Sequence, residues 1–410
     1  MTEQPGWRFS LLDVTRYFRR GRGADRSYAS SREGRGYLRQ GQYQRALDYF
    51  NQAIALAPDD VAAHTGRGRA YYGMRQYQQA RADFEHALRF DRQQFEAHFW
   101  LGQTLYALAE YQLAIESYGQ AIWLKRRDAA TYHNRGQAHF HLQDYPTALT
   151  DFSRALKLSP RFALAYTNRG LTYLELKQYK KALRDLRQAL AIDPGQRRAY
   201  FGSGQALYEM KDYTRALAFY RQALKIAPTC QAYNNLGVAL EALQEHEQAI
   251  EAYTCAIELD PMQWTLYNNR GWSYYALKDA TSALADFERA INSNSEAAYD
   301  AYLNRAWLLA ERGEYERALT ECNHILLWGI QDALAYAYRA RVYCWQGDEA
   351  QALADCTQAL VNDPNCAEAY GVRGLVYARQ KRVAEARLAY EKTRELGHGL
   401  FWLEEAEIAP

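Results

Sequence analysis

Apolar and small residues recur at intervals of three to four along this chain, in paired stretches separated by short polar segments. Tyr166, Gly170 and Tyr173 share one helical face, and Ala182 and Leu186 share a second one after a polar break. Spacing of this kind is typical of amphipathic helices, whereas apolar residues alternate in strands. The pattern therefore predicts a hairpin of two helices.

This hairpin is repeated eleven times. A small residue recurs every 34 residues, with two one-residue slips, at Gly34, Gly68, Gly102, Gly136, Gly170, Gly204, Gly237, Gly271, Ala306, Ala340 and Gly374. An alanine stands twelve residues after each of them, at Ala46, Ala80, Ala114, Ala148, Ala182, Ala216, Ala249, Ala283, Ala318, Ala352 and Ala386. Prolines, which cannot continue a helix, follow the second helix at Pro58, Pro160, Pro194, Pro228, Pro261 and Pro364. Such a period predicts an all-α solenoid, in which each repeat buries its apolar face against its neighbours.

From about Ser27 to Leu400 these residues resemble the signature of the tetratricopeptide repeat. The resemblance implies a right-handed superhelical α-solenoid of antiparallel helix pairs, whose first helices line a concave groove that holds an extended peptide or a partner helix. We expect a basic extension over residues 1–26, one solenoid over 27–400 and a short acidic tail over 401–410. A glycine inside a helix costs about 1 kcal/mol relative to alanine. Its recurrence therefore predicts that a tyrosine or phenylalanine of a neighbouring helix packs against it.

Charged residues also follow the repeat. An arginine precedes the small residue in seven repeats, at Arg67, Arg135, Arg169, Arg270, Arg305, Arg339 and Arg373. Sixteen residues later, six of these repeats carry an acid, at Asp83, Asp151, Asp185, Asp286, Glu321 and Asp355. This correlation predicts an ion pair inside each of the six hairpins. Because desolvation offsets the attraction of a partly buried pair, we expect its role to be geometric.

The residue before that arginine position forms what we call the asparagine ladder: Asn134, Asn168, Asn235, Asn269 and Asn304. An amide both donates and accepts, so it can hydrogen-bond the backbone of an extended peptide without reading its sequence. The series resembles the asparagine ladder in the groove of O-GlcNAc transferase, which implies a peptide-binding role. The alternative is that these amides bond neighbouring helices or shape the hairpin.

Aromatic residues near the ladder are the other candidate contacts. The family resemblance implies that five of them face or flank the groove: Phe201, Tyr208, Trp272, Tyr275 and Trp307. Large aromatic side chains are favoured anchors at interfaces. The alternative is that they fill gaps between helices, since the chain contains 34 tyrosines.

Composition narrows the class of partner. A net charge of +2 and a charged fraction of 24% lack the basic excess of a dedicated nucleic-acid binder, and argue against such a partner. No apolar run approaches the roughly 20 residues that span a bilayer, and no signal-peptide region is present, so we expect a cytoplasmic protein. The six cysteines include no CxxC pair and are expected to be reduced packing residues.

The sequence offers no constellation for catalysis, and we expect neither an enzyme nor a cofactor. His133, His139 and His141 lie on one predicted helix, but the outer two are roughly 12 Å apart along the axis, too far for one metal ion. No phosphate-binding loop is present. We therefore expect structural histidines and no metal site.

Two functions remain. The first is a non-enzymatic scaffold that binds an extended peptide or helix of a partner protein in the concave groove. The second is a structural subunit of a larger assembly, which binds through its convex face, its ends or its basic N-terminus. Within residues 1–26, Trp7, Leu11, Val14 and Phe18 can form an apolar stripe. Such a stripe would either cap the first hairpin or dock on a partner or an anionic membrane.

Overall fold

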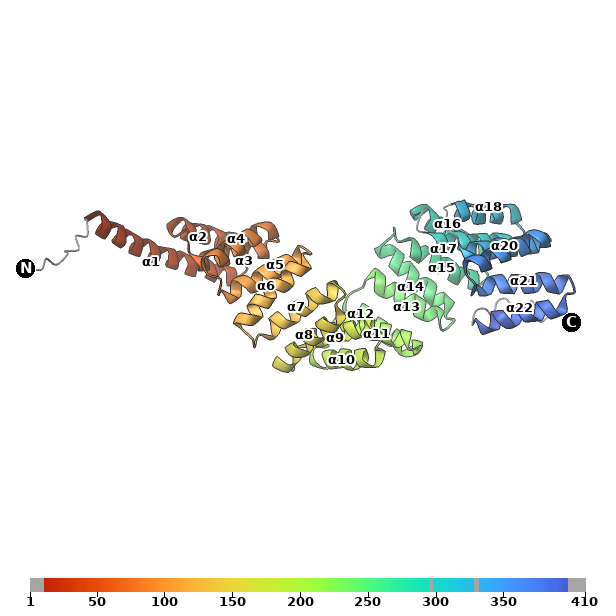
Figure 1. The fold of residues 1–410 in the computed structure, drawn as a ribbon, viewed down its shortest axis with the longest axis horizontal. Coiled ribbons are helices and arrows are strands. Elements are labelled where there is room, and N and C mark those ends of the chain that lie inside the picture. Colours follow the sequence, from red (N-terminus) through yellow and green to blue (C-terminus); the bar gives the residue numbers. More distant parts are fainter. Residues whose placement is uncertain (1–10, 295–297, 328–331, 397–410) are drawn as a thin grey trace, which may run out of the picture. The chain divides into compact units, whose positions relative to one another are not determined.

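The computed structural model describes residues 11–294, 298–327 and 332–396, with side chains from residue 25 onward. In these ranges the regular structure is helical throughout, as the sequence predicts (Figure 1). The first helices of the eleven repeats are α1 (Leu11–Arg39), α3 (Val61–Gly73), α5 (Phe95–Ala107), α7 (Ala129–His141), α9 (Ala163–Glu175), α11 (Arg197–Glu209), α13 (Cys230–Glu241), α15 (Trp264–Ala276), α17 (Tyr299–Glu311), α19 (Ala333–Gln346) and α21 (Ala367–Arg379). The second helices are α2 (Tyr43–Leu56), α4 (Tyr77–Phe90), α6 (Tyr111–Leu124), α8 (Tyr145–Leu158), α10 (Tyr179–Ile192), α12 (Tyr213–Ile226), α14 (His246–Leu259), α16 (Ala280–Ser293), α18 (Tyr315–Leu327), α20 (Glu349–Asn362) and α22 (Val383–Glu395).

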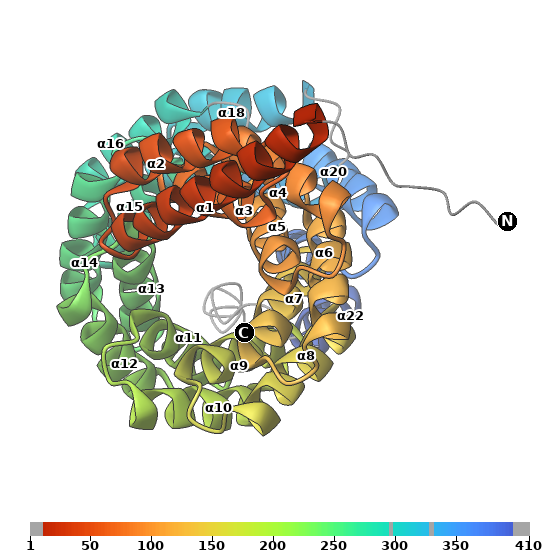
Figure 2. The same cartoon turned by 90° about the vertical axis from the view of Figure 1, so that its left-hand side faces the viewer.

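The helices group into two compact units, residues 1–210 and 211–410. Within each unit a helix packs on the next one along the chain, and successive first helices also contact each other. Successive second helices make no such contact among the described residues. The first helices therefore lie on the inner side of the curve of each unit. Figure 2 shows this for α5, α7 and α9, with α6, α8 and α10 outside them.

The recurring glycine is a seat for an aromatic ring. A Cβ on Gly68 would lie 2.8 Å from the ring of Phe84, and one on Gly237 would lie 2.5 Å from that of Tyr253. Each of these rings comes from the second helix of the same hairpin, sixteen residues further on, and Gly170 has Leu186 in the same place. A Cβ cannot approach so closely without displacing the ring, so the structure confirms the predicted packing.

The two repeats without this glycine show the complementary change. Ala306 and Ala340 stand where the other repeats have glycine, and Cys322 and Cys356 stand where most have a ring. Both cysteines are fully buried. The larger alanine on the first helix is matched by a smaller cysteine on the second helix. This size match explains why both cysteines stand at the same repeat position. Burial raises the pKa of Cys322 to about 12, as expected for a packing residue.

The turn between the two helices requires a left-handed residue. In all eleven repeats the residue seven positions after the small one has positive φ, including Lys177 at 56° and Gly347 at 89°. Three repeats place glycine there, and the other eight place a residue with a Cβ, which costs energy in this region. Beyond the second helix, each of the six prolines lies two residues after the last helical residue, as predicted.

The first helix extends beyond the first repeat on its N-terminal side. Helix α1 runs without interruption from Leu11 to Arg39, so residues 11–26 and the first helix of the first repeat are one helix. It packs on α2 and α3. The side chains of the proposed apolar stripe and the whole acidic tail lie outside the described residues.

Candidate functional site

All six predicted ion pairs are present. Arg135 donates from Nε and Nη2 to the two carboxylate oxygens of Asp151, both at 2.8 Å. The same two-pronged contact joins Arg67–Asp83, Arg169–Asp185, Arg270–Asp286 and Arg339–Asp355, with distances of 2.6–2.9 Å. In the sixth pair, Nη2 of Arg305 donates to both oxygens of the longer Glu321. The acids are nearly buried, so each pair locks the second helix of a hairpin to the first.

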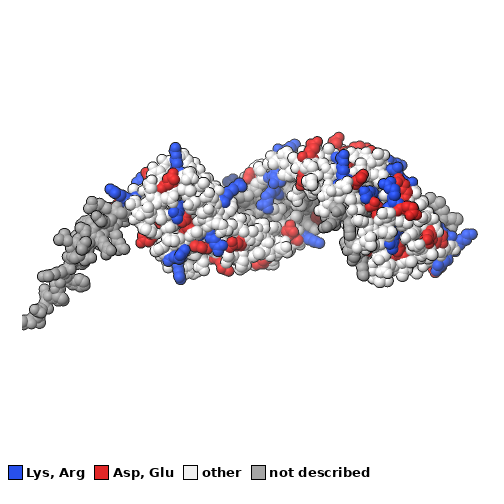
Figure 3. Space-filling view, turned by 90° about the horizontal axis from the view of Figure 1, so that it is seen from above, with Lys and Arg blue, Asp and Glu red and all other residues white. Residues whose placement is uncertain are grey.

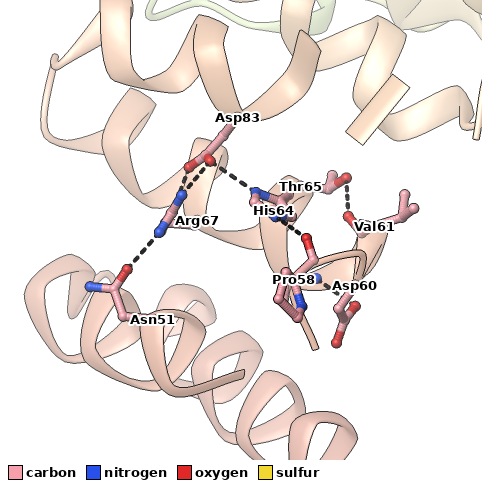
Figure 4. A network of polar contacts seen from close by, with 9 residues as sticks. Asn51, Pro58, Asp60, Val61, His64, Thr65, Arg67 and Asp83 are labelled. Carbon is pink, nitrogen blue, oxygen red and sulfur yellow. Dashed lines mark hydrogen bonds and ion pairs between the residues drawn. The ribbon is translucent and has the colours of Figure 1, made fainter. Parts of the chain in front are cut away.

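The arginine also reaches the preceding repeat, which the sequence analysis missed. Figure 4 shows Nη1 of Arg67 donating to Oδ1 of Asn51 on α2, at 2.8 Å, while the other two nitrogens hold Asp83. Arg169, Arg270 and Arg339 make the same contact with polar residues sixteen positions upstream: Ser153, Thr254 and Asn323. The sequence did indicate this contact, because a polar residue stands sixteen positions before each of these four arginines. One guanidinium thus joins three helices of two repeats.

The residue three positions before the arginine completes this cluster. In six repeats it is a tyrosine whose ring lies 5.0–5.8 Å from the guanidinium carbon, as for Arg169 and Tyr166. In the second repeat the position holds His64 instead. Its Nδ1 lies 3.1 Å from Asp83 and its Nε2 lies 3.0 Å from the carbonyl of Pro58 (Figure 4). In this repeat, two polar contacts of a histidine replace the ring contact of the tyrosine.

The asparagine ladder lies on the first helices, where its members hydrogen-bond between repeats. In residues 1–210, Nδ2 of Asn168 donates to Nε2 of His133 on α7, at 2.8 Å. This nitrogen must then be the unprotonated one, so Nδ1 of His133 donates to Oδ1 of Asn134, at 3.1 Å. Burial, opposed by the Asn134 hydrogen bond, lowers the pKa of His133, consistent with the neutral ring that this chain of hydrogen bonds requires.

The same connection recurs in residues 211–410. Nδ2 of Asn269 donates to Oδ1 of Asn234, at 3.1 Å, and Asn234 donates in turn to Asn235, at 3.4 Å. Nδ2 of Asn304 donates to Oδ1 of Asn268, at 2.9 Å. The structure therefore shows the contacts between neighbouring helices that were the alternative explanation of the ladder.

These contacts leave hydrogen-bonding capacity on each amide. Among the described residues, Nδ2 of Asn134 and Nδ2 of Asn235 donate to nothing, and Oδ1 of Asn168, Asn269 and Asn304 accepts nothing. Except for Asn168, whose exposure is 8%, these side chains are partly exposed. Bonding between repeats and contact with a ligand are therefore compatible.

The aromatic candidates divide into two groups. Trp272 on α15 is 37% exposed and stacks on Tyr275 with ring centres 5.0 Å apart. Trp307 on α17 donates to the Tyr275 hydroxyl, at 3.0 Å, and packs against Trp345 and the buried cluster around Ala340. Trp272 therefore presents an accessible face, whereas Trp307 and Tyr275 are mainly packing residues. Phe201 and Tyr208 lie partly exposed on α11.

One pocket opens between first helices in residues 1–210. Its lining comes from α5, α7, α8, α9 and α11 and consists of Tyr106, Gln137, Phe140, His141, Phe152, Asn168, Leu171 and Arg198. Only Asn168 among them was predicted as a site residue. The others were missed because a pocket formed by four repeats leaves no local motif in the sequence.

The other two histidines of α7 contact neighbouring side chains. His139 lies 3.1 Å from Asp144, and His141 stacks on Tyr111 with centres 4.7 Å apart. In the described part of the chain no three metal-binding side chains converge. No described helix combines the length and apolar character needed to cross a membrane. On the face shown in Figure 3, basic and acidic side chains are interspersed rather than gathered in patches of one sign.

Two comparisons describe individual proteins that this chain resembles. FlbA of Caulobacter vibrioides is 32% identical over 89 residues, which are 22% of this chain and 15% of FlbA, so the match spans a small part of that protein. Among solved structures, YrrB, described as a TPR protein with an unusual peptide-binding site, is 23% identical, with a TM-score of 0.41. The match covers 46% of this chain and 98% of YrrB. Pseudomonas aeruginosa pilF is 20% identical, with a TM-score of 0.45, and the match covers 49% of this chain and 92% of that one.

Family comparison covers most of the repeats. Profiles described as tetratricopeptide repeat match residues 34–100, 95–128, 127–195, 167–229, 231–262, 268–326 and 339–397. Together with the tandem helix pairs and the glycine seats, these matches identify the chain as a member of the tetratricopeptide repeat family.

Proposed function

We propose that this chain, whose repeat family is typical of protein–protein interaction scaffolds, binds an extended peptide segment of a partner along its first helices. The observation that carries the proposal is the half-used asparagine ladder. Asn134 and Asn235 keep N–H groups without partners among the described residues, and Asn269 keeps its carbonyl oxygen. An extended backbone offers donors and acceptors at regular intervals, so repeated amides suit it. The exposed face of Trp272 supports the same surface as an anchor.

The test must remove a ligand contact without breaking the bonds between repeats. Asn134 and Asn235 use Oδ1 as acceptors, so Asn134→Asp together with Asn235→Asp keeps the accepting oxygen and removes the unpartnered N–H groups. The matched control is Asn51→Asp with Asn323→Asp. These residues also accept through Oδ1, but on second helices.

The full chain and both variants would be screened against a displayed library of random nonapeptides, with thermal melts measured in parallel. We expect the ladder variant to lose most binding of the selected peptides, while the control variant binds like the original chain and both melt normally. Equal binding by the ladder variant would show that the peptide does not contact these amides and would overturn the groove assignment.

Exposed apolar side chains on the second helices favour a second function, that of a subunit in a larger assembly. Phe90 and Trp123, near the ends of the second helices α4 and α6, are 57% and 61% exposed. Large apolar side chains that are exposed together are typical of protein contact surfaces. We infer from them a candidate assembly surface on the outer face. If assembly is the main role, Phe90→Ser with Trp123→Ser should abolish partner binding, while the ladder variant retains it.

A further inference from the structure

The pocket between α5, α7, α8, α9 and α11 has the size of a small side chain. Its volume is about 80 Å³, several times the roughly 10–15 Å³ that a cavity needs to hold one water molecule. Phe152 is fully buried, and with Leu171 and Phe140 it provides an apolar lining. No lining residue is a carboxylate. An aliphatic side chain fits this volume and this lining.

Asn168 gives the pocket a backbone-binding group. Its side chain is 8% exposed, and its Nδ2 is fixed by the hydrogen bond to His133. Its Oδ1 accepts no hydrogen bond among the described residues. This oxygen is not among the fully enclosed polar atoms that lack a partner, so it is open to a donor that enters the pocket. The backbone N–H of a peptide is such a donor.

Arg198 supplies an unopposed positive charge at the rim. Its side chain is exposed on the first turn of α11 and has neither an ion pair nor a hydrogen bond among the described residues. Burial and the nearby Arg198 lower the pKa of His141, so this second rim residue is neutral near pH 7. The charge of Arg198 is therefore the only one in the lining, and it complements an anion.

From this arrangement we propose that the pocket binds one site of an extended peptide, where an aliphatic side chain stands next to an aspartate or glutamate. The aliphatic side chain enters between Phe152 and Leu171, the backbone N–H donates to Asn168, and the neighbouring carboxylate pairs with Arg198. This inference rests on the proposed peptide-binding function and adds to it the chemistry of the peptide.

The experiment uses the full chain immobilised and a library of nonapeptides with acetylated and amidated ends, randomised at the central positions. The original chain should enrich leucine, isoleucine or valine next to aspartate or glutamate. For selected peptides, replacing the acid with its amide should weaken binding about tenfold or more, the value of one charge-assisted hydrogen bond. In Arg198→Glu this difference should disappear. The matched control is Arg197→Glu, which makes the same charge change on the adjacent residue outside the lining.

The outcomes separate the two proposals. Selected peptides without an acid, or an acid preference that survives Arg198→Glu, would overturn the pocket assignment and leave the proposed function standing. A parallel library with free C-termini is screened in the same way, and binding seen only in that library would also overturn the assignment, because the carboxylate would then be the terminal one. If no sequence is selected at all, both proposals fail.

Discussion

Removing Asp151 should destabilise the fourth repeat more than removing Asp151 and its partner together. The acid is 3% exposed at the side chain and Arg135 is 24% exposed. Asp151→Ala breaks two hydrogen bonds of 2.8 Å and leaves a mostly buried guanidinium without its counter-charge. Asp151→Ala with Arg135→Leu removes both charges and restores an apolar contact.

The burial of the pair sets the expected loss of stability in each variant. Losing one partner of a buried pair costs about 3–5 kcal/mol, whereas replacing both with apolar residues is often close to neutral. Because Arg135 can reach water in part, we expect about 3 kcal/mol for the single variant and about 1 kcal/mol for the double variant. The difference, about 2 kcal/mol, is well above the 0.3–0.5 kcal/mol within which independent sites add.

Native-state hydrogen exchange of the α7 and α8 amides is the suitable assay, because repeats open locally and one melting temperature averages over them. Ser117→Ala is the matched control. Ser117 stands at the acid's position in the third repeat, is 8% exposed and faces no arginine there, since Leu101 occupies the arginine position. It should change stability by less than about 1 kcal/mol. Additive effects in the Asp151 cycle would refute the reasoning.

Three further predictions concern the turn, the acid of an ion pair and the glycine of the repeat. In chemical denaturation, Lys177→Gly should raise the free energy of unfolding by up to about 1 kcal/mol, because it removes the Cβ from a residue with φ of 56°. Gly347→Ala should lower it by a similar amount, and changes of the same sign in the two variants would count against the turn argument. Burial raises the pKa of Asp83 but hydrogen bonds from an arginine and a histidine lower it more, leaving it below its ordinary value. Its stabilisation is therefore complete above about pH 3.9 and is lost as the pH falls through the folded-state pKa, so Asp83→Asn should flatten the acid limb of the stability profile measured by exchange in α3 and α4. Gly237→Ala should destabilise by about 1–3 kcal/mol, because its Cβ would lie 2.5 Å from the Tyr253 ring, and adding Tyr253→Cys should recover part of that loss in chemical denaturation; no recovery would contradict the size match seen at Ala306 and Ala340.

Properties that repeat along the chain could be predicted from the sequence. The packing of a ring on the recurring glycine and the ion pairs both depend on positions that recur with fixed spacing, so the sequence predicted both, including Arg135 beside Asp151. The exchange of glycine for Ala306 together with the smaller Cys322 was also readable in the sequence, because both changes fall in one repeat. These features are local to one hairpin.

Contacts between repeats were harder to predict. The sequence offered two explanations for the asparagine ladder, and the partners of Asn168 and Asn269 became visible only when helices from different repeats were placed side by side. The ligand role of the ladder stays a prediction. Arg198 carried no signal, because a single surface arginine has no periodic counterpart, and its importance depends on a pocket formed by several helices.

The guanidinium clamps determine how the array should respond to a pulling force. Arg67, Arg169, Arg270 and Arg339 each bind a polar side chain of the preceding repeat. Arg135 of the fourth repeat makes no such contact, because the third repeat has Gly119 at the corresponding place. The junctions between repeats should therefore differ in their resistance to extension. In a single-molecule stretching experiment we expect the junction between the third and fourth repeats to part before the junction between the fourth and fifth repeats, which Arg169 and Ser153 hold together.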